Sequence, residues 1–199
     1  MTMDFAIPLG VPFVKFAAFA VIALLTAATY MQCEKAYHSE EMSVKSKLCI
    51  AEELESFAHD HWLHETTLLG AARLRRMLRI DPAFDVAVLA PAADVATFAR
   101  TLEAQCGFTL ESSETSDDWT WSLADKGKLF KLSRFEEDGE RLVHREAARP
   151  NEVLSRGSVL PTTPCNVGRA QFKCPHDEHA FLEAVFGKQW RTAPLLSFL

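Results

Sequence analysis

The chain has 199 residues, a formal net charge of −6 and 48% hydrophobic residues. This length leaves room for one membrane segment and one domain of about 150 to 165 residues, which is large enough to bury a core. The net charge is negative and the sequence contains no basic tract, which is the usual sign of nucleic-acid binding. We therefore expect no nucleic-acid partner.

The N-terminal region contains an apolar run over residues 14–31 in which Lys15 is the only charged residue. A helix of this length spans about 27 Å, just enough to cross a bilayer. We therefore predict a single-pass anchor within residues 1–33, with the lipid bilayer as the partner of residues 14–31. A cleaved signal peptide and a buried hairpin are the alternatives. The polar residues 34–47 are expected to form a membrane-proximal stalk.

The remaining residues, 48–199, are predicted to form an α+β domain. Apolar periodicity and turn residues predict the following elements in chain order: an amphipathic helix over 48–63, a turn and short helix from His64, a buried strand over 85–90, a helix over 92–107, a hairpin of strands 120–124 and 128–135, mostly loop over 141–165, a strand over 169–174, and a helix from Pro175 to Gly187. A few strands in one sheet with helices packed on it follow from this order.

Two stretches of this domain resemble the LicD/fukutin group of phosphotransferases. The first stretch reads HWLHETTLLGAARLRRMLRIDPAFDVAVLA, and its matching residues are Thr67, Leu68, Leu69, Gly70, Ala71, Arg73, Asp81 and Asp85. The second reads FKCPHDEHAFLEAVFGKQW, and its matching residues are Phe172, Pro175, Leu182, Phe186, Gly187 and Trp190. The resemblance implies a nucleotidyltransferase-like mixed sheet with packed helices.

The resemblance also implies a chemistry. Proteins of this group move phosphocholine or a phospho-sugar alcohol from a CDP-activated donor to a glycan, with Mg²⁺ or Mn²⁺ as cofactor. Such ions need hard oxygen ligands, and two carboxylates at positions i and i+2 of a strand grip them from one direction. A third carboxylate from a neighbouring strand completes the site.

This sequence departs from that pattern at several positions. Ala83 stands two residues before Asp85, Pro82 follows Asp81, and Thr66 replaces the glycine before the Thr-Leu-Leu-Gly turn. The best match to the third acid is Ser133, next to Arg134. We therefore expect no catalytic residues and no metal cofactor, with Asp81 and Asp85 as vestigial metal ligands. The vestigial phosphate site would consist of Thr67, Gly70 and Arg73.

An active site remains the alternative. Asp81 and Asp85 could converge across the proline turn, and a replacement acid could come from another position. The candidates are Glu65, Glu136, Glu137 and Asp138. The basic run Arg73, Arg75, Arg76 and Arg79 could bind phosphate, or it could form a solvated or partner-facing helix surface.

The five cysteines are Cys33, Cys49, Cys106, Cys165 and Cys174. An odd number without a CxxC motif does not decide the redox compartment. Cys165 and Cys174 with His176 and His179 are a weak zinc candidate, because their spacing is not a standard one. A Cys165–Cys174 disulfide, or ordinary thiols with surface histidines, are the alternatives. His59, His61 and His64 are expected on the surface or in packing contacts, and Trp119 and Trp121 in the core or an interface.

These observations lead to two main functional hypotheses, and to a third in which the chain is a small-molecule or nucleotide sensor that kept the pocket but lost the chemistry. The first is an inactive member of the group that serves as an accessory or structural subunit of a membrane assembly, with other membrane-protein subunits as partners. The alternative is an active metal-dependent phosphotransferase. In both cases we expect a single-pass protein of an organelle membrane. An accessory subunit would suit the mitochondrial inner membrane, and an active phosphotransferase would suit the Golgi or endoplasmic reticulum.

Overall fold

The computed structural model describes residues 42–78, 83–112, 120–125, 128–145 and 152–194. The predicted membrane span 14–31, Asp81 and Trp119 therefore lie outside the described residues. Within these ranges, no helix combines the length and the apolar character needed to cross a membrane. The chain divides into two compact units, Met1–Ser39 and Glu40–Leu199, and every described element belongs to the second.

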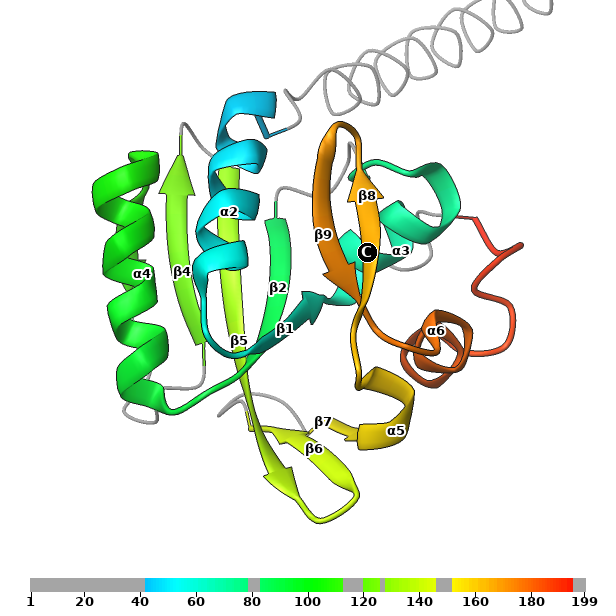
Figure 1. Cartoon of the computed structure of the whole chain (residues 1–199). Helices are drawn as coiled ribbons and strands as arrows, with labels where there is room; N and C mark the ends of the chain where they lie inside the picture. Colours follow the sequence, from blue (N-terminus) through cyan, green and yellow to red (C-terminus); the bar gives the residue numbers. More distant parts are fainter. Residues whose placement is uncertain (1–41, 79–82, 113–119, 126–127, 146–151, 195–199) are drawn as a thin grey trace, which may run out of the picture. The chain divides into compact units, whose positions relative to one another are not determined.

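A mixed sheet of seven strands organises this unit (Figure 1). Its main path runs in the order β1-β2-β5-β4-β3, and β6 and β7 continue from the far end of β5. The strands are β1 (Asp60–Leu63), β2 (Ala83–Leu89), β3 (Thr109–Ser112), β4 (Thr120–Asp125), β5 (Lys128–Asp138), β6 (Arg141–His144) and β7 (Glu152–Ser155). Only β2 and β5 pair in parallel among these described strands; the other pairs are antiparallel.

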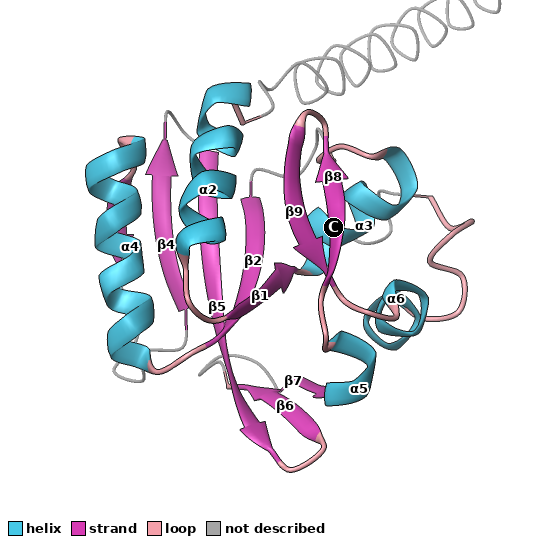
Figure 2. Ribbon diagram, viewed as in Figure 1, coloured by secondary structure: helices cyan, strands magenta, loops and turns pink. Residues whose placement is uncertain are grey.

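Two helices, α2 (Val44–Ser56) and α4 (Ala92–Cys106), pack over one face of the sheet (Figure 2). Each helix buries a stripe of apolar residues with helical spacing, as an amphipathic helix requires. The buried apolar residues are Ile50 and Leu54 in α2, and Val95, Phe98, Ala99 and Leu102 in α4. Gly107 ends α4 with a positive φ of 73°, a backbone conformation that suits glycine.

A separate two-stranded hairpin, β8 (Thr163–Val167) and β9 (Ala170–Cys174), lies beside α2 over the same sheet face. Phe172 of β9 contacts Phe84 of β2 with ring centroids 5.0 Å apart, which joins the hairpin to the core. The remaining helices are α3 (Glu65–Leu74), α5 (Arg156–Val159) and α6 (Glu178–Phe186). Asp177 caps α6, because its carboxylate accepts a hydrogen bond from the Ala180 amide at 2.9 Å.

Most of the predicted elements are confirmed. The strand at 85–90, the helix at 92–107 and the hairpin at 120–135 correspond to β2, α4 and β4–β5. The buried position of Trp121 is confirmed as well. The mixed α+β sheet with packed helices is therefore present, as the residue pattern indicated.

Two predicted boundaries are wrong. The helix predicted over 48–63 ends at Ser56, because residues 60–63 pair with β2 as strand β1. Of the stalk predicted over 34–47, the described residues 42–47 include the start of α2 at Val44, after the capping residue Ser43. Residues 141–165 are not mostly loop but contain β6, β7, α5 and the start of β8. Strand β1 forms through pairing with β2, which follows it only after the whole of α3, and local patterns do not reveal such a pairing. Strands β6, β7 and β8 instead pair with neighbouring segments of the chain.

Two disulfides connect elements of this unit. Cys49 of α2 bonds Cys106 at the end of α4, across 57 residues of sequence, and Cys165 bonds Cys174 within the β8–β9 hairpin. The first bond ties the two helices that cover the sheet. Closing so long a loop removes much of the conformational entropy of the unfolded chain.

We predict that the double substitution Cys49→Ala with Cys106→Ala lowers the free energy of unfolding by about 4 kcal/mol, because the unfolded chain regains the entropy of the 57-residue loop. Chemical denaturation monitored by circular dichroism measures the change. Reduction of the unmodified chain should have an effect at least as large, because it also opens the Cys165–Cys174 bond. An unchanged denaturation midpoint in both experiments would contradict the pairing.

Candidate functional site

Asp85 is the described residue around which the candidate site is built. It lies in the middle of β2, where its side chain is only 2% exposed. Its backbone N–H donates to Thr67 Oγ1 at 2.8 Å, and its backbone carbonyl accepts from the His64 N–H at 3.1 Å. The Thr66 hydroxyl donates to the Asp85 carboxylate at 3.5 Å. The start of α3 thus holds Asp85 from both sides of its backbone.

The sheet register determines which side chains share a face with Asp85. Side chains alternate along a strand, so Ala83 and Ala87 are its same-face neighbours on β2. On the parallel strand β5, Lys131 lies directly opposite Asp85, and Leu129 and Ser133 lie opposite Ala83 and Ala87. None of these positions carries a second carboxylate. Ser133, the residue aligned with the third acid, lies on the same face one pair further along β5, opposite Ala87.

Glu65 lies at the start of α3, beside this site, but the other three replacement acids suggested by the sequence lie elsewhere. Glu136, Glu137 and Asp138 follow Phe135, the last residue of β5 that pairs with β2, and they pair with β6 instead. Glu136 forms an ion pair with Arg134 at 2.6 Å, and Glu137 forms one with Arg156 at 3.0 Å. Among the described residues, no three or more His, Cys, Asp or Glu side chains are arranged to hold a metal ion.

The turn into α3 is strained at Glu65. This residue has a φ of +44°, in the left-handed region that side chains other than glycine rarely adopt. Thr66, which aligns with the family glycine, does not have a positive φ. The unusual backbone of this turn therefore falls on Glu65, and Thr66 adopts a negative φ that a β-branched residue allows. Holding a non-glycine residue there costs on the order of 1 kcal/mol.

A buried histidine also belongs to this site, and the sequence did not single it out. His64 precedes α3 and is 1% exposed, with its ring packed edge-on against Phe135 and Phe181. Its Nε2 forms a hydrogen bond with Glu152 Oε2 of β7 at 3.1 Å. Because these partners lie 88 residues apart in the sequence, no local signal could have linked them.

The acidic surroundings of His64 set its charge. Burial alone lowers the pKa of an imidazole, but the Glu152 carboxylate opposes this effect by charge and by hydrogen bonding, and Glu65 and Asp85 add to it. The net result is a pKa above the ordinary histidine value. The site therefore favours the protonated form of His64 close to Asp85. The positive charge near this carboxylate then comes from a protein side chain and not from a bound cation.

We predict that Glu152→Gln lowers the free energy of unfolding by about 3 kcal/mol between about pH 5 and 6.5, because it leaves His64 buried without its carboxylate partner. A raised pKa in the folded state stabilises the protein fully below the unfolded value of 6.5, and this stabilisation is lost as pH rises through the folded value. The difference between the two proteins should therefore shrink at alkaline pH. Urea denaturation at several pH values measures it, and a difference that grows with pH would refute the prediction.

Comparison with known proteins identifies the family to which this site belongs. The family model described as LicD/FKTN/FKRP, nucleotidyltransferase domain, matches residues 59–177, which is more than half of the chain. The chain belongs to the LicD family. The resemblance in the sequence is therefore confirmed, and the matched region includes Asp85, α3 and the paired strands β2 and β5.

The other comparisons add less to this assignment. No curated protein matches the sequence. Among solved structures, the chain is similar to the solution structure of the antibiotic-resistance factor ANT(2'')-Ia, with 13% identity and a TM-score of 0.43 over 75% of this chain and 71% of that one. A likeness this loose carries no argument about the site.

Within the LicD motif, Gly70 has a packing role. A Cβ atom at this position would lie 2.6 Å from the Arg76 carbonyl oxygen and 3.0 Å from the Leu78 amide. Glycine is therefore required because the chain after α3 folds back across it. This contact explains why glycine occupies position 70. It does so without the phosphate-binding role that the sequence analysis gave to Gly70.

The two other residues of the proposed phosphate site also have structural partners. Thr67 is buried and uses its hydroxyl to hold the Asp85 amide. Arg73 donates from Nη1 to the Ala193 carbonyl at 2.9 Å, which fastens the C-terminal segment to α3. Thr67 is therefore hydrogen-bonded to Asp85, whereas the hydrogen bond of Arg73 goes to the C-terminal segment.

We predict that Gly70→Ala lowers the free energy of unfolding by about 1 to 3 kcal/mol, because its Cβ overlaps backbone atoms that have no free space. Gly157→Ala is the matched control, since a Cβ there meets no atom within 4 Å and its φ is not positive. Thermal melting compares the two variants. Equal melting temperatures would show that the chain around Arg76 yields at little cost.

The zinc candidate of the LicD chain is wrong. Cys165 and Cys174 form a disulfide, so neither provides a thiolate ligand. His179 is half-exposed, pairs with Glu183 one helical turn away at 3.6 Å, and contacts the Trp190 ring. His176 is exposed and forms a backbone hydrogen bond to Val159. The two cysteines therefore stabilise the β8–β9 hairpin, and the two histidines lie on or just before α6.

Proposed function

We propose that this LicD-family chain does not catalyse metal-dependent phosphotransfer and serves as an accessory or structural subunit of a membrane assembly. The observation that carries the proposal is the composition of the Asp85 face. Ala83 stands at the i−2 position, and Leu129, Lys131 and Ser133 occupy the same face of the neighbouring strand. A two-carboxylate grip on a divalent ion cannot form from these residues.

Electrostatics supports the same conclusion. Mg²⁺ and Mn²⁺ sites need several oxygen ligands, and a donor diphosphate adds negative charge that the ions must neutralise. Here Lys131 lies opposite Asp85 on the sheet, and the raised pKa of His64 favours a second cation nearby. Two positive side chains around one carboxylate oppose metal binding, because like charges repel in a poorly solvated interior.

We infer the role as a subunit from the structural features that the chain retains without the metal site. Its core, its LicD fold and its two disulfides support a stable domain whose surfaces are available for contacts, since fold and site chemistry are separable. Disulfides persist in oxidising compartments. We therefore place the domain on the oxidising side of an organelle membrane, anchored by residues 14–31, with other membrane-protein subunits as its partners.

The alternative is an active phosphotransferase with a CDP-activated donor. Family membership and the buried Asp85, with Thr66 and Thr67 beside it, favour this alternative. In that case Mg²⁺ or Mn²⁺ would be the cofactor and Asp81, outside the described residues, would have to assist Asp85. The two proposals make opposite predictions about metal binding.

We predict that the purified chain binds neither Mn²⁺ nor CDP with micromolar affinity, because one carboxylate beside Lys131 cannot hold the ion. Isothermal titration calorimetry with Mn²⁺ and CDP, alone and together, measures this. Micromolar, metal-dependent CDP binding that Asp85→Asn abolishes would support the active enzyme instead.

A restoring variant makes this experiment sharper. Ala83→Asp together with Lys131→Asp places three carboxylates on one face of β2 and β5. We expect Mn²⁺ binding to strengthen at least tenfold in this variant. The variant Ala83→Asn with Lys131→Asn has side chains of similar size without the charges, so it controls for changes in packing.

A further inference from the structure

Three segments meet at one end of the unit that contains the LicD fold. The Gly168 amide in the β8–β9 turn donates to the Arg75 carbonyl at the end of α3 at 2.8 Å. A Cβ atom at Gly168 would also lie 3.9 Å from Lys47 Nζ in the first turns of α2. The exposed side chains of these segments form what we call the apolar–basic surface. Its residues are Val44, Lys45, Leu48, Leu74, Arg75 and Arg169.

The apolar part of this surface is unusual for the chain. Across the described ranges, the exposed large hydrophobic side chains are Val44, Leu48, Leu74 and Val153, and three of these four belong to the surface. Val44 and Leu48 are one helical turn apart, so they lie side by side on α2. Each of the three is at least 40% exposed. Clustering of this kind marks an interaction site more often than scattered exposure does.

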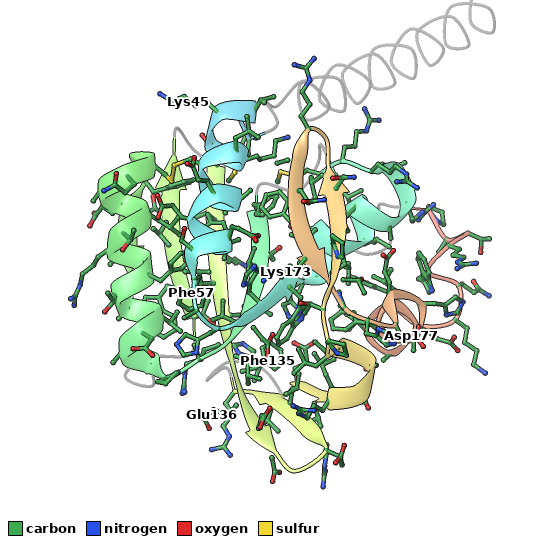
Figure 3. All side chains as sticks on the ribbon, in the orientation of Figure 1. Lys45, Phe57, Phe135, Glu136, Lys173 and Asp177 are labelled. Carbon is green, nitrogen blue, oxygen red and sulfur yellow. A yellow bond between two sulfur atoms is a disulfide. The ribbon has the colours of Figure 1, made fainter. Side chains whose placement is uncertain are left out.

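The charged part of the surface is basic, although the whole chain carries a net charge of −6. Lys45, Arg75 and Arg169 are exposed there, and Glu178, whose charge acts on Arg75, is only partly exposed. Along α2, lysines occupy the first half and the acids Glu52, Glu53 and Glu55 occupy the second. Figure 3 shows Lys45 projecting from the start of α2, at the opposite end of the unit from Glu136.

Acidic residues gather at that opposite end. The end of β5 and the turn to β6 carry four exposed acids, which are Glu136, Glu137, Asp138 and Glu140. Arg134 and Arg156 pair with the first two of them. The unit therefore has a basic end with exposed aliphatic side chains and an acidic end. This asymmetry favours one orientation next to a negatively charged surface.

The position of the surface in the chain indicates what that negatively charged partner is. The proposed membrane span ends at residue 31, and the surface begins at Val44. The intervening residues can extend at most about 45 Å, so a bilayer that holds the span is within reach of the domain. Basic residues close to anionic lipid, together with aliphatic side chains that enter the headgroup region, are the usual elements of membrane-surface binding.

We propose that the apolar–basic surface docks on an anionic lipid surface and so orients the LicD domain, with its β5–β6 end away from the bilayer. Docking depends on contacts between Lys45, Arg75 and Arg169 and lipid phosphates, and on burial of Val44, Leu48 and Leu74. It requires no catalytic activity, so its failure would not affect the proposal about phosphotransfer.

The test is hydrogen exchange of the full chain, reconstituted in vesicles of neutral phosphatidylcholine or of phosphatidylcholine with phosphatidylserine. We expect amides in 42–48, 74–78 and 166–170 to exchange several-fold more slowly on the anionic vesicles, and the effect to weaken at high salt. The variant Lys45→Glu with Arg169→Glu should lose this protection, since each basic residue near such a surface strengthens binding about fivefold.

The matched control is Arg100→Glu with Arg141→Glu, which changes the net charge equally at exposed sites outside the surface. It should keep the protection, and thermal melting should show that both variants are folded. Equal exchange on the two kinds of vesicle, or equal loss in the control, would overturn the proposal. Protection that instead grows with protein concentration in detergent would assign the surface to a second copy of the chain and would also overturn it.

Discussion

The attachment of Asp85 to the start of α3 is the interaction on which the rest of the site depends. The Asp85 N–H reaches the Thr67 hydroxyl, and its carbonyl accepts the His64 N–H. These two bonds join the central strand to the helix and bury the aspartate. Its carboxylate then lies at a helix N-terminus, where the helix dipole and the Thr66 hydroxyl stabilise a negative charge. Asp85 therefore has a structural reason to be present without any metal.

Once β2 is held in this way, the sheet register decides the chemistry around Asp85. Parallel pairing with β5 places Lys131 opposite it, and the path of β7 brings Glu152 to His64. A buried carboxylate needs compensating positive charge, which a catalytic relative could take from a metal ion. Here protein side chains are placed to supply it, and this arrangement supports the proposed loss of phosphotransfer.

The fold itself does not depend on that chemistry. The apolar stripes of α2 and α4, the disulfide between them and the packing of Phe84 against Phe172 stabilise the unit through contacts that do not include the Asp85 carboxylate. A chain built in this way can lose a metal site and keep its surfaces. The proposed lipid-facing end and its separation from the acidic β5–β6 turn would then be the properties that matter for its role.

The resemblance of two motifs was enough to predict the family. Local residue patterns predicted the central strand, α4 and the β4–β5 hairpin, because continuous apolar runs, helical periodicity and turn residues act over short distances. They also identified Ala83 as a departure from the metal motif. The tertiary structure alone decided that residues 60–63 form a strand, that Cys165 pairs with Cys174, and that Gly70 is packed against Arg76. It also brought His64 to Glu152 and Lys131 opposite Asp85. The pairing of β1, the contact of His64 with Glu152 and the position of Lys131 depend on residues far apart in the chain, and such contacts are determined by the register and packing of the whole sheet. The Cys165–Cys174 bond and the packing of Gly70 join residues close in the sequence, but they depend on how the hairpin and the chain after α3 fold back.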